Sequence, residues 1–130
     1  MGQLDGKVAI ITGGGSGIGK GIAKAFADED CSVVIAARNA DRLDAAAAEL
    51  SVGGRTVISI PTDVTNEEQM ISLFAKTMDQ FGKLDGLVHN ASILGTQMPI
   101  EQYDIKLWYS TLQINLSAPF MLTQFLIPAL

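Results

Sequence analysis

The sequence predicts an α/β fold in which helices flank a doubly wound, parallel sheet. Short apolar runs alternate along the chain with segments of helical periodicity. The apolar runs lack polar alternation, which is typical of strands that are buried on both faces of a parallel sheet. A glycine-rich loop separates the first apolar run from the first helical segment.

Four apolar runs are predicted to be strands. They are Val8–Thr12, Ser32–Ala37, Thr56–Ile60 and Gly86–His89. Right-handed crossovers between parallel strands place the first strands of such a sheet in the order 3-2-1-4. We therefore expect a Rossmann-type sheet, truncated to about four strands, in a single domain that spans residues 1–130.

Four segments are predicted to be helical. They are Gly17–Glu29, Ala40–Leu50, a segment after Thr65, and a last segment from about Asp104 toward the C-terminus. Asn39 is placed to cap the second helix. Thr65 and Glu68 fit a capping box at the start of the third helix, and Gly82 can end that helix.

The composition argues for one folded domain and against a nucleic-acid partner. The chain has 130 residues, of which 48% are hydrophobic and 18% charged, so it can bury a sizeable core. Its net charge is −5 at pH 7. Nucleic-acid binding depends largely on basic side chains, so an acidic chain is not expected to bind nucleic acid.

The remaining features of the composition suggest a cytoplasmic protein. Cys31 is the single cysteine, so no internal disulfide is possible and a reducing compartment fits. The N-terminus has no basic region followed by an apolar run, so no signal peptide is predicted. The segment Leu107–Leu130 carries no charge, but its polar residues and prolines favour a helix buried in protein over a membrane span. No metal site is predicted.

The glycine loop predicts a phosphate-binding site. Gly13, Gly17 and Gly19 follow an apolar strand and open a helix. Glycines allow a tight turn and close approach of the backbone to a pyrophosphate, and the helix start directs unpaired N–H groups at the anion. The alternative is an ordinary turn, but the strand before the loop and the helix after it favour nucleotide binding.

The end of the second strand favours NADP(H) over NAD(H). NAD sites place an acidic residue there to bind the ribose 2′-hydroxyl. Here that position is Ala37, and the next residue is Arg38, whose guanidinium suits a 2′-phosphate. Ser16 could add a hydroxyl. The alternative is that Arg38 is simply a solvated loop residue.

The sequence resembles the short-chain dehydrogenase/reductase superfamily over essentially its whole length. The segment Thr12–Gly19 resembles the cofactor loop of that family. Three later segments agree with the family in order and spacing: Asp63-Val64-Thr65, His89-Asn90-Ala91-Ser92 and Ile114-Asn115-Leu116. Two positions depart from the family pattern, because Ser92 replaces a usual glycine and His89 a usual asparagine. The segment Leu84–Leu126 resembles bacterial oxidoreductases of the YciK type.

The resemblance implies the NADP(H)-binding portion of an oxidoreductase that transfers hydride between a nicotinamide and a carbonyl or alcohol substrate. The residues implied for the pyrophosphate are Gly13, Ser16, Gly17, Ile18 and Gly19. Those implied for the 2′-phosphate are Arg38 and Asn39. Those implied for the adenine are Asp63 and Val64, and those for the ribose and nicotinamide are Asn90, Ala91 and Ser92. Asn115 alone represents the catalytic set of the family.

A purely structural role is also considered for Asp63, Asn115 and His89. Asp63 could serve as a turn residue that binds backbone N–H groups, and both roles can coexist. Pro119 lacks an N–H, so the carbonyl of Asn115 four residues earlier loses its helical partner. In the family that carbonyl holds a water of the proton relay; a simple kink is the equal alternative. His89 is expected to be a packed residue without a catalytic role.

The catalytic serine and the Tyr-x-x-x-Lys pair of the family are absent. Tyr103 and Tyr109 are the only tyrosines, and neither has a lysine four residues later. We therefore expect this chain alone to be inactive. A non-catalytic NADP(H)-binding or interaction module is the alternative, and an early-terminated product is a third possibility.

An incomplete sheet would leave apolar surface uncovered. The fourth strand would form a sheet edge with unpaired backbone groups. The last helix would expose an apolar face that is formed by Leu112, Leu116, Phe120 and Leu126. Such patches recruit a partner, so we expect a homo-oligomer, domain swapping or a further C-terminal segment.

Overall fold

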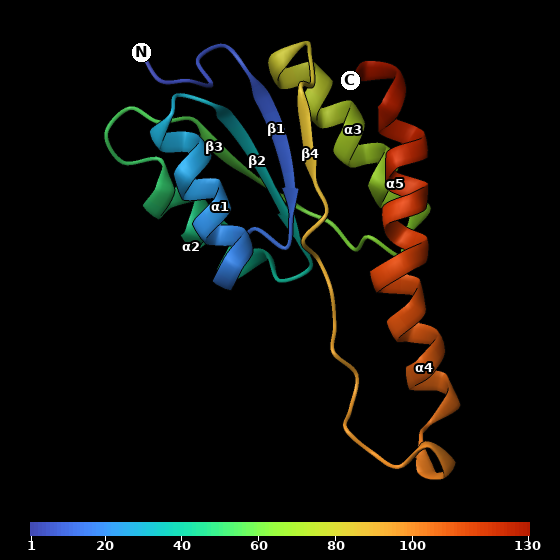
Figure 1. Cartoon of the computed structure of the whole chain (residues 1–130). Helices are drawn as coiled ribbons and strands as arrows, with labels where there is room; N and C mark the ends of the chain where they lie inside the picture. Colours follow the sequence, from blue (N-terminus) through green and yellow to red (C-terminus); the bar gives the residue numbers. More distant parts are fainter.

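A computed structural model describes all 130 residues and has one parallel sheet with helices on both faces (Figure 1). The strands are β1 (Val8–Thr12), β2 (Ser32–Ala37), β3 (Val57–Pro61) and β4 (Gly86–Val88). All neighbouring strands are parallel, and their order is β3-β2-β1-β4. The predicted fold class and strand order are therefore confirmed, with β4 as one edge of the sheet.

The helices follow the predicted segments closely. They are α1 (Gly17–Asp28), α2 (Ala40–Leu50), α3 (Glu67–Phe81), α4 (Ile105–Leu112) and α5 (Ala118–Leu126). A π-helical segment, Gln113–Ser117, joins α4 to α5, and short 3₁₀ turns span Ile100–Gln102 and Ile127–Ala129. Figure 1 shows α4, the π segment and α5 as one continuous rod, whose α4 end extends beyond the sheet.

The core consists of two apolar layers, one on each face of the sheet. On one face, α1 and α2 pack on the strands through small and aliphatic side chains such as Ala23, Ala27 and Leu43. On the other face, α3 and α5 pack through Met70, Leu73, Leu122 and Leu126. Strands that are buried on both faces need no polar alternation, which explains the apolar runs. Cys31 is buried in the first layer, and burial raises the pKa of its thiol.

The caps of α2 and α3 differ in how well the sequence predicts them. Asn39 caps α2 as predicted, since its side-chain oxygen accepts a hydrogen bond from the Arg42 N–H. The predicted capping box at Thr65 is wrong, because Asn66 caps α3 by accepting from the Gln69 N–H. The Thr65 hydroxyl instead donates to Asp63 Oδ1 at 2.7 Å. Gly82 ends α3 with a left-handed φ of 72°, as predicted.

The helical rod departs from α-helical geometry close to Pro119, the proline that was expected to disturb it. Pro119 lies in the first turn of α5, so the residue four positions after Asn115 has no N–H to donate to the Asn115 carbonyl. Just before it, the Ala118 N–H bonds to the carbonyl of Gln113, five residues back, so the backbone forms a π turn. Such turns are a recognised response of a helix to a local irregularity.

The outer face of the helical rod is apolar and exposed, with one exception to the prediction. Leu112, Leu116 and Phe120 are 37%, 66% and 67% exposed. Leu126 was expected to belong to this face but is fully buried, because α5 packs its last turn into the core layer beside α3. None of the helices is both long and apolar enough to cross a bilayer.

Candidate functional site

A cleft of about 760 Å³ opens at the carboxyl ends of the strands. This edge of an open α/β sheet is where ligands bind, at the point where the strand order reverses between β1 and β4. Ten of the predicted cofactor residues line the cleft: Gly13, Ser16, Ile18, Arg38, Asn39, Asp63, Val64, Asn90, Ala91 and Ser92. Six further residues complete its wall: Ala36, Ala37, Arg42, Thr62, Ile93 and Ile114.

The glycine loop closes one end of the cleft and requires glycine at specific positions. Gly13 and Gly17 have φ values of +69° and +55°, which side chains rarely tolerate. Gly19 lies in α1, where a Cβ atom would overlap the Gly13 carbonyl oxygen and the Asn90 amide nitrogen. Gly17 and Gly19 therefore shape the loop although neither lines the cleft.

A hydroxyl that sequence reasoning did not single out joins the two loops of the site. Thr12 Oγ1 accepts hydrogen bonds from the backbone N–H groups of Asn90 and Ala91, at 3.0 and 3.1 Å, and donates to the Val88 carbonyl at 3.3 Å. The Asn90 side chain adds a bond from Nδ2 to the Gly13 carbonyl at 3.1 Å. Thr12 could have been identified from the sequence, because it is a polar residue at the end of an otherwise apolar strand.

The first turn of α1 is free to receive an anion. Ser16 precedes the helix, but its side chain makes no capping hydrogen bond, and the first turn contains no acidic residue. The first N–H groups of a helix have no partners within it and carry the positive end of the helix dipole. Because Ser16 and Ile18 both line the cleft, this helix start suits a phosphate group.

Two exposed arginines stand at the end of the cleft near β2. Arg38 follows the strand, and Arg42 lies in the first turn of α2. Neither forms a salt bridge with an acidic side chain, so both guanidinium groups are available. The Asn39 side chain is already engaged as the α2 cap, which limits what it can offer a ligand. Arg42 was not predicted to belong to the site. Its position four residues after Arg38 was the feature of the sequence that could have indicated it.

Asp63 holds the turn between β3 and α3. Its Oδ1 accepts hydrogen bonds from the Thr65 hydroxyl at 2.7 Å and the Thr65 N–H at 2.9 Å. These bonds lower the pKa of the Asp63 carboxyl, and the charge of Arg38 contributes a smaller effect in the same direction. The turn role anticipated for Asp63 is therefore confirmed, and Asp63 also lines the cleft.

Asn115 anchors the loop that follows β4. Its Oδ1 accepts from the Ile93 N–H at 2.9 Å, and its Nδ2 donates to the Ile93 carbonyl at 2.7 Å. The side chain thus pairs with one backbone residue as a neighbouring strand would. Asn115 is not in the wall of the cleft, although Ile93 and Ile114 are. This contact involves the side chain, whereas the sequence argument concerned the backbone carbonyl.

His89 is exposed to solvent but contacts α5 through one hydrogen bond. Its Nε2 lies 2.7 Å from the Thr123 hydroxyl. Partial burial lowers the pKa of the imidazole, so the ring is neutral at neutral pH. His89 is not part of the cleft wall.

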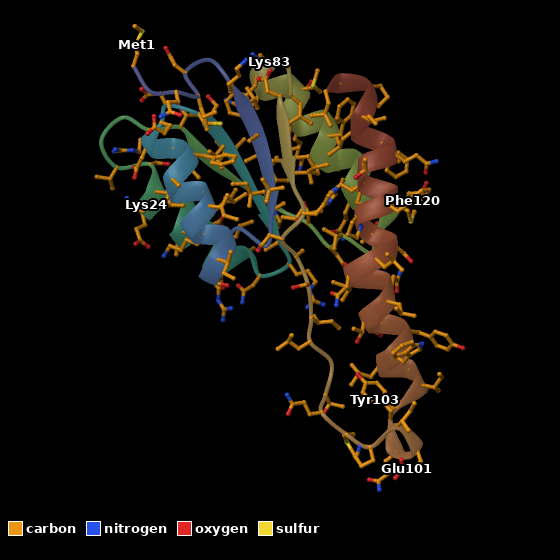
Figure 2. All side chains as sticks on the ribbon, viewed as in Figure 1. Met1, Lys24, Lys83, Glu101, Tyr103 and Phe120 are labelled. Atoms are coloured by element: carbon orange, nitrogen blue, oxygen red, sulfur yellow. The ribbon has the colours of Figure 1, made fainter.

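The wall of the cleft contains neither a tyrosine nor a lysine, the pair that is absent from the sequence pattern. Tyr103 lies at the far end of the loop after β4, and Figure 2 shows it there beside Glu101. Tyr109 lies on α4, and neither tyrosine lines the cleft. No group of three or more His, Cys, Asp or Glu side chains is arranged to hold a metal ion.

A family model described as "short chain dehydrogenase" matches residues 7–130. The chain belongs to the short chain dehydrogenase family. Among relatives of this family, a short chain dehydrogenase/reductase of Colletotrichum higginsianum is 38% identical over 122 residues, which are 94% of this chain and 46% of the relative. A protein named 3beta-hydroxysteroid dehydrogenase from Mediterraneibacter gnavus is 34% identical over 120 residues, 92% of this chain and 44% of its own length.

Solved structures of short-chain dehydrogenases share the fold. A metagenomic short-chain oxidoreductase in complex with NADP has a TM-score of 0.91 and 28% identity, over 97% of this chain and 57% of that one. A short-chain type dehydrogenase/reductase from Mycobacterium ulcerans has a TM-score of 0.92 and 32% identity, over 97% and 47%. The chain thus spans about half the length of these relatives. The similarity to the YciK type stays a prediction.

Proposed function

We propose that this chain is the NADP(H)-binding portion of a short-chain dehydrogenase/reductase that acts on a carbonyl or alcohol substrate. One observation carries the proposal: a single cleft joins a glycine cradle, a free helix start and two unpaired arginines. The cradle fits a pyrophosphate, since a side chain at Gly13 or Gly19 would collide with Asn90 or the loop backbone.

Each wall of the cleft would bind a different part of the dinucleotide. The Gly13–Gly19 loop and the α1 start would hold the pyrophosphate, and Asp63 and Val64 would contact the adenine. Asn90, Ala91 and Ser92 would line the ribose and nicotinamide end. When bound, the dinucleotide supplies or accepts a hydride at the nicotinamide ring. The chain's own contribution is to orient it through these contacts, and Asn115 keeps the loop after β4 in place.

Arg38 and Arg42 support NADP(H) as the preferred form. A 2′-phosphate adds negative charge, which two guanidinium groups would stabilise, and the strand end has Ala37 in place of the acidic residue of an NAD site. A structural neighbour was solved in complex with NADP.

Catalysis would need more than these 130 residues supply. The cleft has no tyrosine or lysine to transfer the substrate proton. We therefore infer that the chain binds the cofactor but does not turn substrate over alone. The second candidate is a non-catalytic NADP(H)-binding module, which the same cofactor cleft would serve.

Titration with NADPH and NADH tests the cofactor assignment. We expect NADPH to bind with at least about tenfold higher affinity, equivalent to about 1.4 kcal/mol. The Arg38→Ala variant should lose most of this preference and keep its NADH affinity. Arg55→Ala is the matched control, because Arg55 pairs with Asp28 and does not line the cleft. Equal or tighter NADH binding by the unmodified chain would reject the assignment.

A turnover assay separates the two candidates. NADPH consumption is measured with a panel of ketones, for the chain alone and after addition of the C-terminal half of a relative. Activity only in the supplemented sample would support the enzyme portion, whereas cofactor binding without turnover in either sample would support the module.

A further inference from the structure

A smaller cleft of about 420 Å³ opens beside the cofactor cleft, where β3 ends and α3 approaches it. Five residues line this smaller cleft: Arg38, Pro61, Thr62, Asp63 and Gln69. Arg38, Thr62 and Asp63 also line the cofactor cleft, so the two clefts share a wall. Gln69 is the residue of α3 that lies in this region, and neither the sequence motifs nor the cofactor contacts proposed above assign it a role.

We propose that Gln69 is a positioning residue for recognition of the adenine base, an inference that rests on the proposed function. Gln69 acts through Asp63. Its side chain fixes the backbone of Asp63, and the Asp63 carboxylate then accepts a hydrogen bond from the exocyclic amino group of adenine. The pair thus selects a dinucleotide that contains a 6-aminopurine over one that contains a 6-oxopurine.

The Gln69 side chain bonds directly to the backbone of Asp63. Gln69 Oε1 accepts a hydrogen bond from the Asp63 N–H at 2.7 Å, and the Gln69 N–H donates to Asn66 Oδ1 at 3.1 Å. In an ordinary capping box, the glutamine at this third helical position bonds to the N–H of the cap residue itself. Here the side chain reaches past the cap, Asn66, to Asp63. It therefore ties α3 to the residue that lines both clefts.

The Asp63 carboxylate has one oxygen engaged in the turn and one that is free for a ligand. Thr65 occupies Oδ1 through its N–H and its hydroxyl, whereas no protein group donates to Oδ2. These bonds lower the pKa of the carboxyl, so Asp63 is an anionic acceptor at neutral pH. Because Thr65 holds the side chain and Gln69 holds the backbone, Oδ2 is presented to the cofactor cleft in a defined position.

An anionic acceptor distinguishes adenine from a 6-oxopurine by the group at position 6 of the base. Adenine has an amino group there, and its hydrogen bond to a charged acceptor is a strong one. Hypoxanthine has an oxygen at that position, which brings two acceptors together and leaves the carboxylate unpaired. Such discrimination depends on a carboxylate that is held in place, because a mobile side chain can turn away from the wrong base.

The Gln69 side chain is not needed for the cap of α3. Asn66 provides that cap by accepting from the backbone N–H of residue 69, a bond that any side chain at that position permits. The Asp63 N–H lies before the helix, and the Gln69 side chain is its hydrogen-bond partner. Loss of the Gln69 amide should therefore affect the turn at Asp63 more than the helix.

Isothermal titration calorimetry with NADP⁺ and deamino-NADP⁺ tests the inference. Deamino-NADP⁺ has an oxygen in place of the adenine amino group and carries the same phosphates, so the ratio of the two affinities isolates recognition of the base. We expect the unmodified chain to prefer NADP⁺ at least about tenfold. Gln69→Met keeps the length of the side chain but removes the acceptor, and it should reduce the preference to about threefold or less.

Three further variants distinguish positioning from a general effect on the fold. Gln69→Glu retains an acceptor oxygen for the Asp63 N–H and should keep the preference. Gln80→Met is the matched control, because Gln80 is an exposed residue of the same helix that lines neither cleft. Asp63→Asn supplies an amide that can also donate, so it should abolish the preference, and Gln69→Met should then change the ratio no further.

Hydrogen exchange provides a measurement that needs no variant. The Asp63 amide of the unmodified chain should be protected, because its hydrogen is bonded to Gln69 Oε1. Circular dichroism reports whether each variant is folded. An unprotected Asp63 amide would overturn the inference even if Gln69→Met failed to fold.

The affinity ratios supply the other contradicting outcomes. Equal binding of NADP⁺ and deamino-NADP⁺ by the unmodified chain would overturn the inference and leave the proposed function intact. An undiminished preference in Gln69→Met, or its loss in Gln69→Glu or Gln80→Met, would show that Gln69 does not act through the Asp63 N–H. Failure of both dinucleotides to bind the unmodified chain would instead reject the proposed function, and the inference with it.

Discussion

Gly19 is the position at which a single added carbon should disturb the site most. A Cβ in Gly19→Ala would overlap the Gly13 carbonyl and the Asn90 amide, so the loop must move. We expect a loss of about 1–3 kcal/mol in the free energy of unfolding and a rise of at least about tenfold in the Kd for NADPH. Thermal denaturation and fluorescence titration measure the two effects.

Gly21 provides the matched control in the same helix. A Cβ at Gly21 meets no atom within 4 Å, and its φ is not positive. Gly21→Ala should therefore raise stability by up to about 1 kcal/mol, because alanine has the higher helix propensity. NADPH affinity should not change. Equal behaviour of the two variants would contradict the role assigned to Gly19.

His89 makes the stability of the fold depend on pH in a defined direction. Burial lowers the pKa of the folded-state imidazole below its unfolded value of about 6.5. The unfolded chain then binds a proton first, so stability falls as the pH decreases through the unfolded pKa toward the folded pKa. His89→Gln should lose less stability than the unmodified chain between about pH 7 and pH 5.

Urea denaturation at several pH values measures this difference. Since His89 is the only histidine, NMR titration of its ring also gives the folded-state pKa directly. A folded-state pKa above that of a model peptide would show that the imidazole is stabilised in its charged form and would reverse the expected sign.

At the scale of elements, Asn115 connects the helical rod to the loop after β4. Replacing it with alanine removes two hydrogen bonds to Ile93, at an expected cost of about 1 kcal/mol. The loop should then exchange its amide hydrogens faster, and NADPH should bind more weakly. Gln113→Ala, at an exposed position of the same helical segment, is the control. Unchanged exchange in the loop of Asn115→Ala would show that other contacts hold it.

The sequence predicts the elements well because their signals are local. Apolar runs identified β1 to β4, Asn39 identified the α2 cap, and Gly82 identified the end of α3. The α3 cap was missed because Thr65 and Asn66 are both good caps, and the choice depends on Asp63, which binds the Thr65 hydroxyl. Competition between neighbouring side chains is decided by geometry rather than propensity.

The sequence predicts a residue of the site only where a motif indicates the chemical role of that residue. The glycine loop, Arg38 and Asp63 could be assigned to the cleft, but Thr12 and Arg42 could not. Their roles arise because separate strands end, and a helix begins, at the same edge of the sheet. The same holds for Leu126, which extends the apolar pattern of the outer face but turns into the core.

At the scale of the whole molecule, the exposed outer face predicts self-association. Leu116 and Phe120 are 66% and 67% exposed and lie close together on the helical rod. We expect the chain to exceed its monomer mass of 13.8 kDa in light scattering. The Leu116→Glu/Phe120→Glu double variant should shift it toward the monomer without loss of NADPH binding. A monodisperse monomer of the unmodified chain would contradict this expectation.

The central claim is that backbone amides of the glycine loop bind the pyrophosphate of NADP(H). The most direct measurement is an amide ¹H–¹⁵N NMR titration of the chain with NADP⁺. We predict saturable shifts at the Gly13–Gly19 amides, joined by those of Arg38 and Asn90 on the other walls of the cleft. Shifts that bypass the glycine loop, or no shifts at saturating NADP⁺, would contradict the claim.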